Sequence, residues 1–294
     1  MTIKECLKNA IEILDNANIE DSALKAKLLL SNIIGKSKEY LFIYENEEIV
    51  EKVQKEYFEK IEKMVQNVPL QYLTNSQEFM GMLFYVDENV LIPRSDTEVL
   101  VEEVLKNIDK NKKVKVLDMC TGSGIIGISL AKLCDKIEIL AVDKSENALK
   151  IANRNANING VQDKVKFISS DMFNNLFDLC TNKNMKFDII VSNPPYIETE
   201  MIKMLNKDVQ KEPLMALDGG IDGLDFYRII AENAEKFLYP DGKIFLEIGY
   251  NQCESVSSIF KEKFSDVRCV KDLAGLDRVI VAGCGNWDGS DFHN

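Results

Sequence analysis

The second half of the chain alternates short apolar runs with longer segments of helical periodicity, and this alternation strongly limits its fold. Strands are predicted at residues 114–117, 137–142, 165–168, 187–191, 243–248, 267–270 and 278–281, and helices at 125–133, 146–157, 222–238 and 252–264. Consecutive strands separated by helices pair in parallel, with the helices covering the sheet. The pattern predicts a seven-stranded, Rossmann-like α/β domain.

Residues 1–75 lack strand signals and predict a small α-helical bundle. Leu7, Ala10, Ile11 and Leu14 fall on one face of a helix, and further helices are predicted through residues 28–33 and at 47–66. The apolar stripes are typical of a bundle core, although helices of this kind can also bind a partner.

A β-hairpin is predicted between the bundle and the α/β domain. The apolar runs 78–86 and 90–92 flank the turn-forming residues 87–89. Ser95 and Glu98 have the spacing of a capping box, which predicts a helix that begins there and runs to about residue 110. The expected domains are therefore the bundle at 1–75, a hairpin linker at 76–94, the main domain at 95–283 and a flexible tail at 284–294.

The composition argues against several classes of protein. Lys and Arg number 36 against 48 Asp and Glu, a net charge of −12, so no direct nucleic-acid binding is expected. The seven cysteines form no Cys-x-x-Cys pair, which predicts neither a disulfide framework nor a bound metal. The only histidine is His293, in the tail, so histidine catalysis is not expected. No apolar run approaches the roughly 20 residues of a membrane helix, and we expect a cytoplasmic monomer.

A glycine-rich loop follows the first predicted strand of the sheet and opens a helix. Gly122, Gly124 and Gly127 spell G-x-G-x-x-G, and Asp143 at the next strand end can accept hydrogen bonds from ribose hydroxyls. This pattern alone fits NAD. However, Asp118 just before the glycines would repel a pyrophosphate, whereas it suits a cationic amino or sulfonium group. S-adenosylmethionine carries both groups and is therefore the predicted cofactor.

Asp171 and Met172 follow the third strand of the domain. Because the carboxyl ends of neighbouring parallel strands meet at one edge of a sheet, these residues are expected to complete the cofactor pocket. Asp171 or the adjoining backbone would bind the amino edge of adenine, and Met172 would cover its face. The alternative is that Asp171 is only a turn residue.

The sequence Asn193-Pro194-Pro195-Tyr196 follows the fourth strand directly. Two consecutive prolines restrict the backbone, so the Asn193 side-chain carbonyl and the Pro194 main-chain carbonyl can both face one planar amino group. Tyr196 adds a flat ring that can lie against an amide or a base. This arrangement predicts methyl transfer to nitrogen, whereas a rigid turn that only ends the strand is the simpler reading.

Several further segments resemble the glutamine-N5 methyltransferases that modify peptide chain release factors. The resemblance implies a class I S-adenosylmethionine-dependent methyltransferase domain and, as substrate, the glutamine of a Gly-Gly-Gln loop in release factors, whose methylation modulates translation termination. It also implies that the N-terminal domain touches the release factor. The matching segments are Pro69-Leu70-Gln71-Tyr72-Leu73, Glu78-Phe79-x-Gly81, Val90-Leu91-Ile92-Pro93-Arg94-x-x-Thr97-Glu98, Glu212-Pro213-x-x-Ala216-Leu217-x-Gly219-Gly220-x-Asp222-Gly223-Leu224-Asp225-x-Tyr227-Arg228, Glu247-Ile248-Gly249-x-x-Gln252 and Asp272-Leu273-Ala274-Gly275-x-Asp277-Arg278.

The same resemblance implies roles for individual residues. The cofactor would contact Asp143, Met172, Asn193 and the loop residues Cys120, Thr121, Gly122, Ser123 and Gly124. The substrate glutamine would be held by Asn193, Pro194, Pro195 and Tyr196. In the predicted mechanism, Asn193 and Pro194 accept the two amide hydrogens and Tyr196 stacks on the amide, without a dedicated base.

Three alternatives remain open from the sequence. An exocyclic-amine methyltransferase, acting on adenine N6 or guanine N2 of a nucleic acid, needs the same two acceptors. An NAD-dependent oxidoreductase would explain the glycine pattern, but the chain shows no evident proton donor. A non-catalytic helper protein, whose helices only bind a partner, would not need the combination of Asp118, Asp143 and Asn193.

Overall fold

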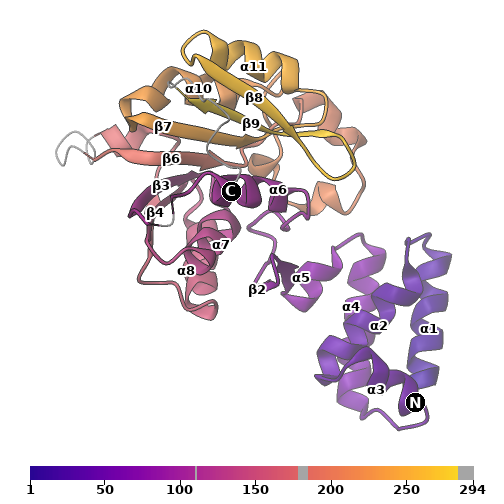
Figure 1. Ribbon diagram of the computed structural model, residues 1–294. Coiled ribbons are helices and arrows are strands. Elements are labelled where there is room, and N and C mark those ends of the chain that lie inside the picture. Colours follow the sequence, from indigo (N-terminus) through magenta and orange to yellow (C-terminus); the bar gives the residue numbers. More distant parts are fainter. Residues whose placement is uncertain (110, 178–184, 284–294) are drawn as a thin grey trace. The chain divides into compact units, whose positions relative to one another are not determined.

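The computed structural model describes residues 1–109, 111–177 and 185–283, and it divides into two compact units (Figure 1). The N-terminal unit comprises Met1–Ser76 and Asn206–Lys211, and the main unit comprises Gln77–Leu205 and Glu212–Asn294. Within the described ranges, no helix has the length and apolar character needed to cross a membrane.

The N-terminal unit is a helical bundle with an apolar core. Its helices are α1 (Ile3–Asn16), α2 (Ser22–Ile34), α3 (Lys38–Ile43), α4 (Glu51–Val65) and α5 (Leu70–Thr74). The 3-10 turn η2 (Val209–Lys211), much later in the sequence, belongs to the same unit. A capping box between Thr2 and Glu5 begins α1, and Gly35 in the left-handed conformation ends α2. Leu14 and Leu29 pack in the core with Tyr57, whose hydroxyl donates to the Ala26 carbonyl over 3.0 Å.

A short hairpin begins the main unit, but its turn is not where the sequence predicted it. Strands β1 (Gln77–Phe79) and β2 (Met82–Phe84) pair around Met80 and Gly81, whose φ angles are 52° and 69°. The chain does turn at the predicted residues 87–89, where the Val90 amide donates to the Asp87 carbonyl over 3.2 Å, but residues 90–92 form no strand, so the predicted hairpin around this turn is wrong. A two-residue hairpin turn of type I′ needs positive φ at both central positions, which Met80 adopts here although methionine rarely does so.

Helix α6 (Thr97–Lys106) begins without the predicted capping box. Asp96 is the cap residue, has helical backbone angles and makes no side-chain cap hydrogen bond. The Glu98 carboxylate instead accepts a hydrogen bond from the Met80 amide over 2.7 Å. Because the Glu98 carboxylate binds the hairpin turn, it does not form the capping box that the Ser-x-x-Glu spacing predicts.

The main unit is built on a seven-stranded sheet, as predicted. The strands are β3 (Val114–Met119), β4 (Ile137–Asp143), β5 (Val165–Ser169), β6 (Phe187–Ser192), β7 (Leu238–Glu247), β8 (Asp266–Lys271) and β9 (Asp277–Gly283). Their spatial order is β5-β4-β3-β6-β7-β9-β8; β9 pairs antiparallel with both β7 and β8, and the other neighbouring strands pair in parallel. The order reverses between β3 and β6, and ligands bind at the carboxyl ends of strands at such a switch point.

Helices cover both faces of this sheet (Figure 1). One core contains side chains of α6, α7 (Ile125–Leu133) and α8 (Glu146–Ile158), and the other contains those of α10 (Asp225–Asn233) and α11 (Cys253–Lys261). Val116 packs in the first core and its neighbour Leu117 in the second, because successive strand residues point to opposite faces. The short 3-10 segments are η1 (Thr199–Met204), η3 (Leu214–Ala216) and η4 (Ala234–Lys236).

Candidate active site

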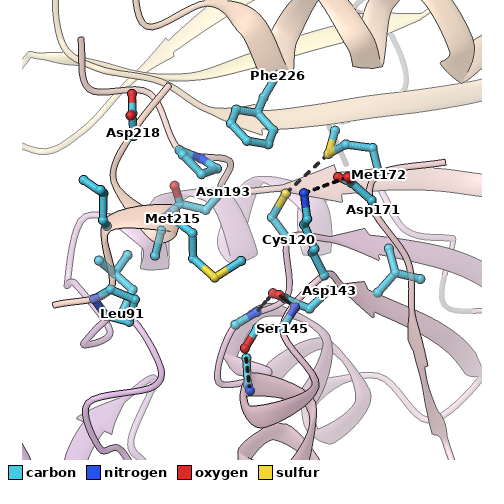
Figure 2. Close-up of a pocket in the computed structure, with 18 of the residues that line it drawn as sticks. Leu91, Cys120, Asp143, Ser145, Asp171, Met172, Asn193, Met215, Asp218 and Phe226 are labelled. Atoms are coloured by element: carbon cyan, nitrogen blue, oxygen red, sulfur yellow. Dashed lines mark hydrogen bonds and ion pairs between the residues drawn. The ribbon is translucent and has the colours of Figure 1, made fainter. Parts of the chain in front are cut away.

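A cavity of about 560 Å³ lies at the carboxyl edge of the sheet, where the strand order reverses (Figure 2). Residues at the ends of β3, β4, β5 and β6 line it, together with residues from three regions apart from these strands in the sequence, near 89–91, at 213–218 and at Phe226. Its lining residues are Asn89, Leu91, Cys120, Gly122, Val142, Asp143, Lys144, Ser145, Ala148, Ser170, Asp171, Met172, Asn193, Pro195, Pro213, Leu214, Met215, Ala216, Asp218 and Phe226.

Asp143 connects the glycine loop to the end of β4. Its Oδ2 accepts a hydrogen bond from the Gly122 amide over 2.8 Å, and its Oδ1 accepts one from the Ser145 amide over 2.8 Å. Burial raises the pKa of Asp143, whereas these backbone donors act in the opposite direction. Each carboxylate oxygen has two lone pairs. Asp143 can therefore hold the loop and still accept hydrogen bonds from a ligand diol.

Asp118 lies behind the glycine loop and is not among the residues that line the cavity. It is fully buried, and its Oδ2 accepts hydrogen bonds from the Thr121 hydroxyl over 2.6 Å and from the Gly127 amide over 3.0 Å. Burial raises its pKa to about 7. The structure thus gives Asp118 a loop-holding position, and a direct bond to the cofactor remains only a prediction.

The buried amide of Asn155, which the sequence did not indicate, also holds this loop. Its Nδ2 donates to the Ser123 carbonyl over 2.9 Å and to the Tyr85 carbonyl over 3.0 Å. Its Oδ1 accepts from the Tyr85 amide over 2.7 Å. Asn155 lies in a helix with several asparagines, and the sequence alone does not show which of them is buried.

Met172 and Cys120 form an apolar part of the wall. Met172 has a positive φ of 51°, and its sulfur lies 3.7 Å from Cys120 Sγ. Burial raises the pKa of the Cys120 thiol, and nearby Asp143 raises it further, so the thiol stays protonated. Asp171 lies beside them and forms a 2.8 Å ion pair with Lys144.

The 193–196 segment leaves the sheet at the end of β6, where the Ser192 hydroxyl donates to the Met119 carbonyl over 2.7 Å. Asn193 is half-buried and lines the cavity, and its Nδ2 donates to the Thr97 hydroxyl over 3.2 Å. Pro195 also lines the cavity, whereas Pro194 and Tyr196 lie outside its lining. Because Thr97 takes the nitrogen side of the Asn193 amide, the carbonyl oxygen remains for a ligand.

The backbone carbonyl of Tyr196 is closely packed against Gln252 and Gly223. The buried Gln252 donates through Nε2 to the carbonyls of Tyr196 and Gly223, over 3.0 Å and 3.3 Å. A Cβ added at Gly223 would lie 2.4 Å from the Tyr196 carbonyl oxygen, so this approach requires glycine. Burial raises the pKa of the Tyr196 hydroxyl, which therefore stays neutral.

Buried Glu212 joins the two remaining walls of the cavity. Its Oε2 accepts a hydrogen bond from the Ile92 amide over 2.9 Å, and its Oε1 forms an ion pair with Arg94. It therefore fixes Leu91 on one wall relative to Pro213 on the other. Phe226 and Met215 also point into the cavity (Figure 2), and the sequence had assigned them no role.

The structure brings most of the predicted cofactor residues together around this one cavity. Six of them line it, namely Cys120, Gly122, Asp143, Asp171, Met172 and Asn193. The other four, Asp118, Thr121, Ser123 and Gly124, belong to the loop or support it without lining the cavity. Gly124 caps α7, where an added Cβ would meet the Ile128 side chain at 2.7 Å.

The lining suits a cofactor of net positive character. Three aspartates, Asp143, Asp171 and Asp218, line the cavity, whereas Lys144 is the single cationic side chain among its lining residues. This excess of negative charge attracts an amino or sulfonium group and repels a pyrophosphate. The acceptors also fit ribose hydroxyls, and Val142, Met172 and Phe226 offer apolar surface for a base. The residues present therefore fit S-adenosylmethionine.

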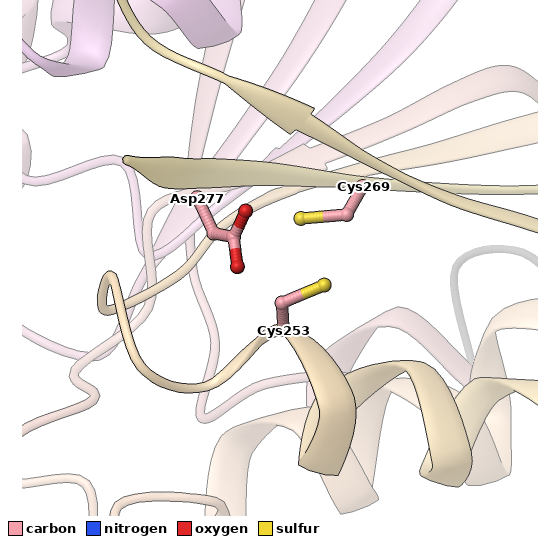
Figure 3. Close-up of side chains that lie close together, drawn as sticks. All are labelled: Cys253, Cys269 and Asp277. Carbon is pink, nitrogen blue, oxygen red and sulfur yellow. The ribbon is translucent and has the colours of Figure 1, made fainter. Parts of the chain in front are cut away.

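A second cluster of polar side chains lies away from this cavity (Figure 3). The ligand atoms of Cys253, Cys269 and Asp277 lie within 4.8 Å of one another. Asp277 Oδ1 already pairs with Lys271 Nζ at 2.7 Å. Burial raises the pKa of the Cys269 thiol, and metals bind thiolates rather than thiols. These contacts are best described as joining β8, β9 and the start of α11.

The fold and the cavity together define a Rossmann-like methyltransferase. Residues 95–212 match the family model described as "Methyltransferase small domain", and residues 5–74 match the one described as "PrmC N-terminal domain". The chain is 41% identical to the release factor glutamine methyltransferase of Clostridium acetobutylicum, over 96% of this chain and 98% of that one. It is 39% identical to the same-named protein of Thermodesulfovibrio yellowstonii, over 87% and 91% of the two chains.

The chain belongs to the release factor glutamine methyltransferase family. This membership confirms the predicted enzyme class, an S-adenosylmethionine-dependent glutamine methyltransferase, and argues against an NAD-dependent oxidoreductase. Solved structures agree on the fold alone. The catalytic domain of hMettl16 in complex with an RNA hairpin is 14% identical with a TM-score of 0.58, covering 71% of this chain and 77% of that one. The T. thermophilus 16S rRNA N2 G1207 methyltransferase is 20% identical with a TM-score of 0.51, covering 71% and 49%.

Proposed function

We propose that this protein transfers a methyl group to the side-chain amide N5 of the glutamine in the Gly-Gly-Gln loop of peptide chain release factors. The observation that carries the proposal is the orientation of Asn193, whose nitrogen faces Thr97 and whose carbonyl oxygen is left for a ligand amide. The names of the relatives support the release factor as substrate. The methylation would modulate translation termination and would take place in the cytoplasm, where release factors act.

The cofactor would occupy the cavity between the glycine loop and residues 213–218. Asp143 would accept the ribose hydroxyls, and Met172 with Val142 would cover the adenine, whose amino edge would face Asp171. Gly122 would allow close approach of the loop backbone, and Asp118, Thr121, Ser123 and Gly124 would hold that loop in shape. S-adenosylmethionine supplies, when bound, a methyl group on a positively charged sulfur.

The chemical difficulty is that an amide nitrogen is a poor nucleophile, because its lone pair is delocalised into the carbonyl. The Asn193 Oδ1 and the Pro194 carbonyl oxygen would each accept one hydrogen of the substrate NH2. Two acceptors increase the electron density on nitrogen and fix its direction, which is how positioning and preorganised dipoles lower a barrier. Pro195 keeps the two carbonyl groups in place because it restricts the backbone that precedes it.

Two neighbouring side chains are unsuited to act as a base or a nucleophile. Tyr196 and Cys120 both have raised pKa values caused mainly by burial, so neither supplies a base or a thiolate near neutral pH. Tyr196 would lie against the substrate amide through its ring. The amide proton can leave after the methyl group has been transferred, when the nitrogen has become strongly acidic, and no dedicated base is needed.

Labelled S-adenosylmethionine tests the proposal directly. The protein is incubated with a release factor and, separately, with ribosomal RNA and DNA, and the labelled product is mapped by peptide mass spectrometry. The expected product carries one methyl group on the glutamine of the Gly-Gly-Gln loop. Incorporation only into nucleic acid would instead favour an exocyclic-amine methyltransferase.

The Asn193→Ala variant tests the role of the acceptor. It should lose nearly all transfer, about 100-fold or more, because a missing transition-state hydrogen-bond partner costs this much in other enzymes. Its affinity for S-adenosylmethionine, measured by calorimetry, should stay within about threefold, since Asp143 and the glycine loop are unchanged. An Asn193→Ala enzyme with wild-type turnover would contradict the mechanism.

The N-terminal unit would dock the release factor. It exposes a group of apolar side chains near its third helix, including Phe42, which is 81% exposed, and Ile43, which is 69% exposed. Replacing both with serine should raise KM for the release factor without changing kcat, because the cavity is untouched. Leu273→Ser, at a fully exposed leucine of the main unit, is the matched control and should leave both constants unchanged. A double variant with wild-type KM would exclude this surface.

A further inference from the structure

Glu247 is the neighbour of Asn193 at the carboxyl ends of the adjacent strands β7 and β6. Ser192 pairs with Leu246 in the parallel register of β6 and β7, so the next residues on the two strands, Asn193 and Glu247, are neighbours. Glu247 is 1% exposed, and its main-chain carbonyl accepts a 2.8 Å hydrogen bond from the buried Tyr227 hydroxyl. Neither Glu247 nor Thr97 is among the residues that line the cavity. Thr97 is fully buried as well, so the two side chains are positioned to act on the reaction through Asn193.

Thr97 links the carboxyl of Glu247 to the amide of Asn193. Its Oγ1 accepts a hydrogen bond from Asn193 Nδ2 over 3.2 Å, and hydrogen bonding from its side chain lowers the pKa of Glu247. A hydroxyl has only one proton, and an ionised carboxylate can only accept. When Glu247 is ionised, the Thr97 proton therefore points to it, which leaves only a lone pair for Asn193. An asparagine facing a lone pair must present its NH2 group.

Burial is the largest influence on Glu247 and raises its pKa to about 7, although hydrogen bonding from Thr97 and Asn193 and the charge of Arg278 lower it. The ionised form that this reasoning needs is therefore the main form above about pH 7. Arg278 is itself held by ion pairs with Asp96 at 3.0 Å and Asp272 at 3.1 Å. Among the described residues, none hydrogen-bonds to Glu247 Oε2, so one oxygen of this buried carboxyl is unsatisfied.

We propose that Glu247 and Thr97 are positioning residues that set the orientation of the Asn193 amide, with the nitrogen turned inward and Oδ1 turned toward the methyl acceptor. This inference rests on the proposed role of Asn193 as a hydrogen-bond acceptor. An asparagine amide is nearly symmetric in shape, and packing alone does not distinguish its oxygen from its nitrogen. The inverted amide would present a donor to the substrate NH2, and the site would lose one of its two acceptors.

A pair of variants at Thr97 separates hydrogen bonding from packing. Thr97→Val keeps the shape of the side chain but removes the hydroxyl, whereas Thr97→Ser keeps the hydroxyl. Thr97→Val should lower kcat by about tenfold or more, since misplacing a catalytic group has effects of this size. KM for the release factor and the affinity for S-adenosylmethionine should change by less than about threefold. Thr97→Ser should retain most of the wild-type kcat.

Glu247→Gln tests the carboxylate itself. Its new NH2 group can donate to Thr97, whose proton would then point to Asn193 and favour the inverted amide. We therefore expect kcat to fall by about tenfold or more, again with little change in KM. Glu103→Gln is the matched control, since Glu103 is also buried and paired with an arginine, Arg268, at 2.5 Å, but lies outside the cavity lining. It should keep wild-type kcat.

Nuclear magnetic resonance gives a readout that does not depend on the substrate. The Asn193 side-chain NH2 signal is identified by its loss in Asn193→Ala. Its shift should change, and its exchange with solvent should accelerate, in Thr97→Val and Glu247→Gln but not in Thr97→Ser. If Thr97→Val shows the wild-type NH2 signal and wild-type kcat, the positioning role is overturned. If the wild-type enzyme methylates no glutamine while the NH2 signal responds as described, the proposed function fails and the positioning of Asn193 stands.

Discussion

The Gly122 amide donates to Asp143 Oδ2 over 2.8 Å, so one carboxylate both holds the glycine loop and faces the cavity. This bond joins the first β–α connection of the sheet to the end of the neighbouring strand β4. A ligand that bonds to Asp143 would therefore contact a glycine loop whose position this hydrogen bond has already fixed.

Asp143→Ala should weaken the binding of S-adenosylmethionine by about 10- to 100-fold, because a hydrogen bond to a charged group contributes about 1.5–3 kcal/mol. Isothermal titration calorimetry measures this change. Asp171→Ala is the matched control, since Asp171 also lines the cavity but its carboxylate is half exposed and paired with Lys144. It should weaken binding by much less, and equal losses for the two variants would contradict the role given to Asp143.

The sequence predicted the sheet and the carboxyl-edge residues well, for a physical reason. Buried parallel strands are nearly continuous apolar runs, and residues that follow them, such as Asp143 and Asn193, meet at one edge whatever the details of packing. The strand order confirmed this expectation.

Other features depend on tertiary contacts that the sequence does not carry. The hairpin turn was missed because Met80 adopts a positive φ, which methionine rarely does. The capping box was misread because Glu98 bonds to that same turn. The place of Glu247 behind Asn193 follows from the register of β6 and β7, and one strand's sequence cannot give its register with another.

Gly127→Ala should destabilise the main unit. A Cβ at this position would lie 2.9 Å from Asp118 Oδ2 and 3.0 Å from the Ile139 side chain, so α7 would have to move away from the sheet. Overpacking of this kind costs about 1–3 kcal/mol of unfolding free energy, which chemical denaturation measures.

Gly283→Ala is the control for this substitution, because its added Cβ would meet no atom closer than 3.6 Å. It should change the unfolding free energy by less than about 0.5 kcal/mol, because the added methyl group would make only ordinary van der Waals contacts. If Gly127→Ala were no less stable than this control, α7 would not depend on close approach at Gly127.

Gln252→Leu should lower turnover without weakening cofactor binding. The substitution removes the hydrogen bonds to the Tyr196 and Gly223 carbonyls, which fix the segment after Pro195. A shift of about 1 Å in a positioned group can lower the rate by about 100-fold, so a loss of tenfold or more is expected. Steady-state kinetics with the release factor measures it. Asn107→Leu, which removes an amide-to-carbonyl bond at the end of α6, should leave kcat unchanged.

Asp118 should make the stability of the main unit depend on pH. Burial raises its pKa from 3.8 to about 7, so between these values the folded state binds more protons than the unfolded state. Its contribution to stability is therefore fully present below about pH 4 and is lost as the pH rises through about 7.

Asp118→Asn isolates this effect, because asparagine can still accept a hydrogen bond from Thr121 or Gly127 but carries no charge. Near pH 5 the folded wild type holds a mostly neutral Asp118, and the variant should differ little from it. At pH 8 the wild type has an ionised carboxylate whose Oδ1 has no hydrogen-bond partner among the described residues. The variant should then gain stability relative to the wild type, by an amount on the order of 1 kcal/mol or more. Urea unfolding at the two pH values measures the difference, and a gain that does not grow with pH would show that Asp118 is ionised in the folded state throughout this range.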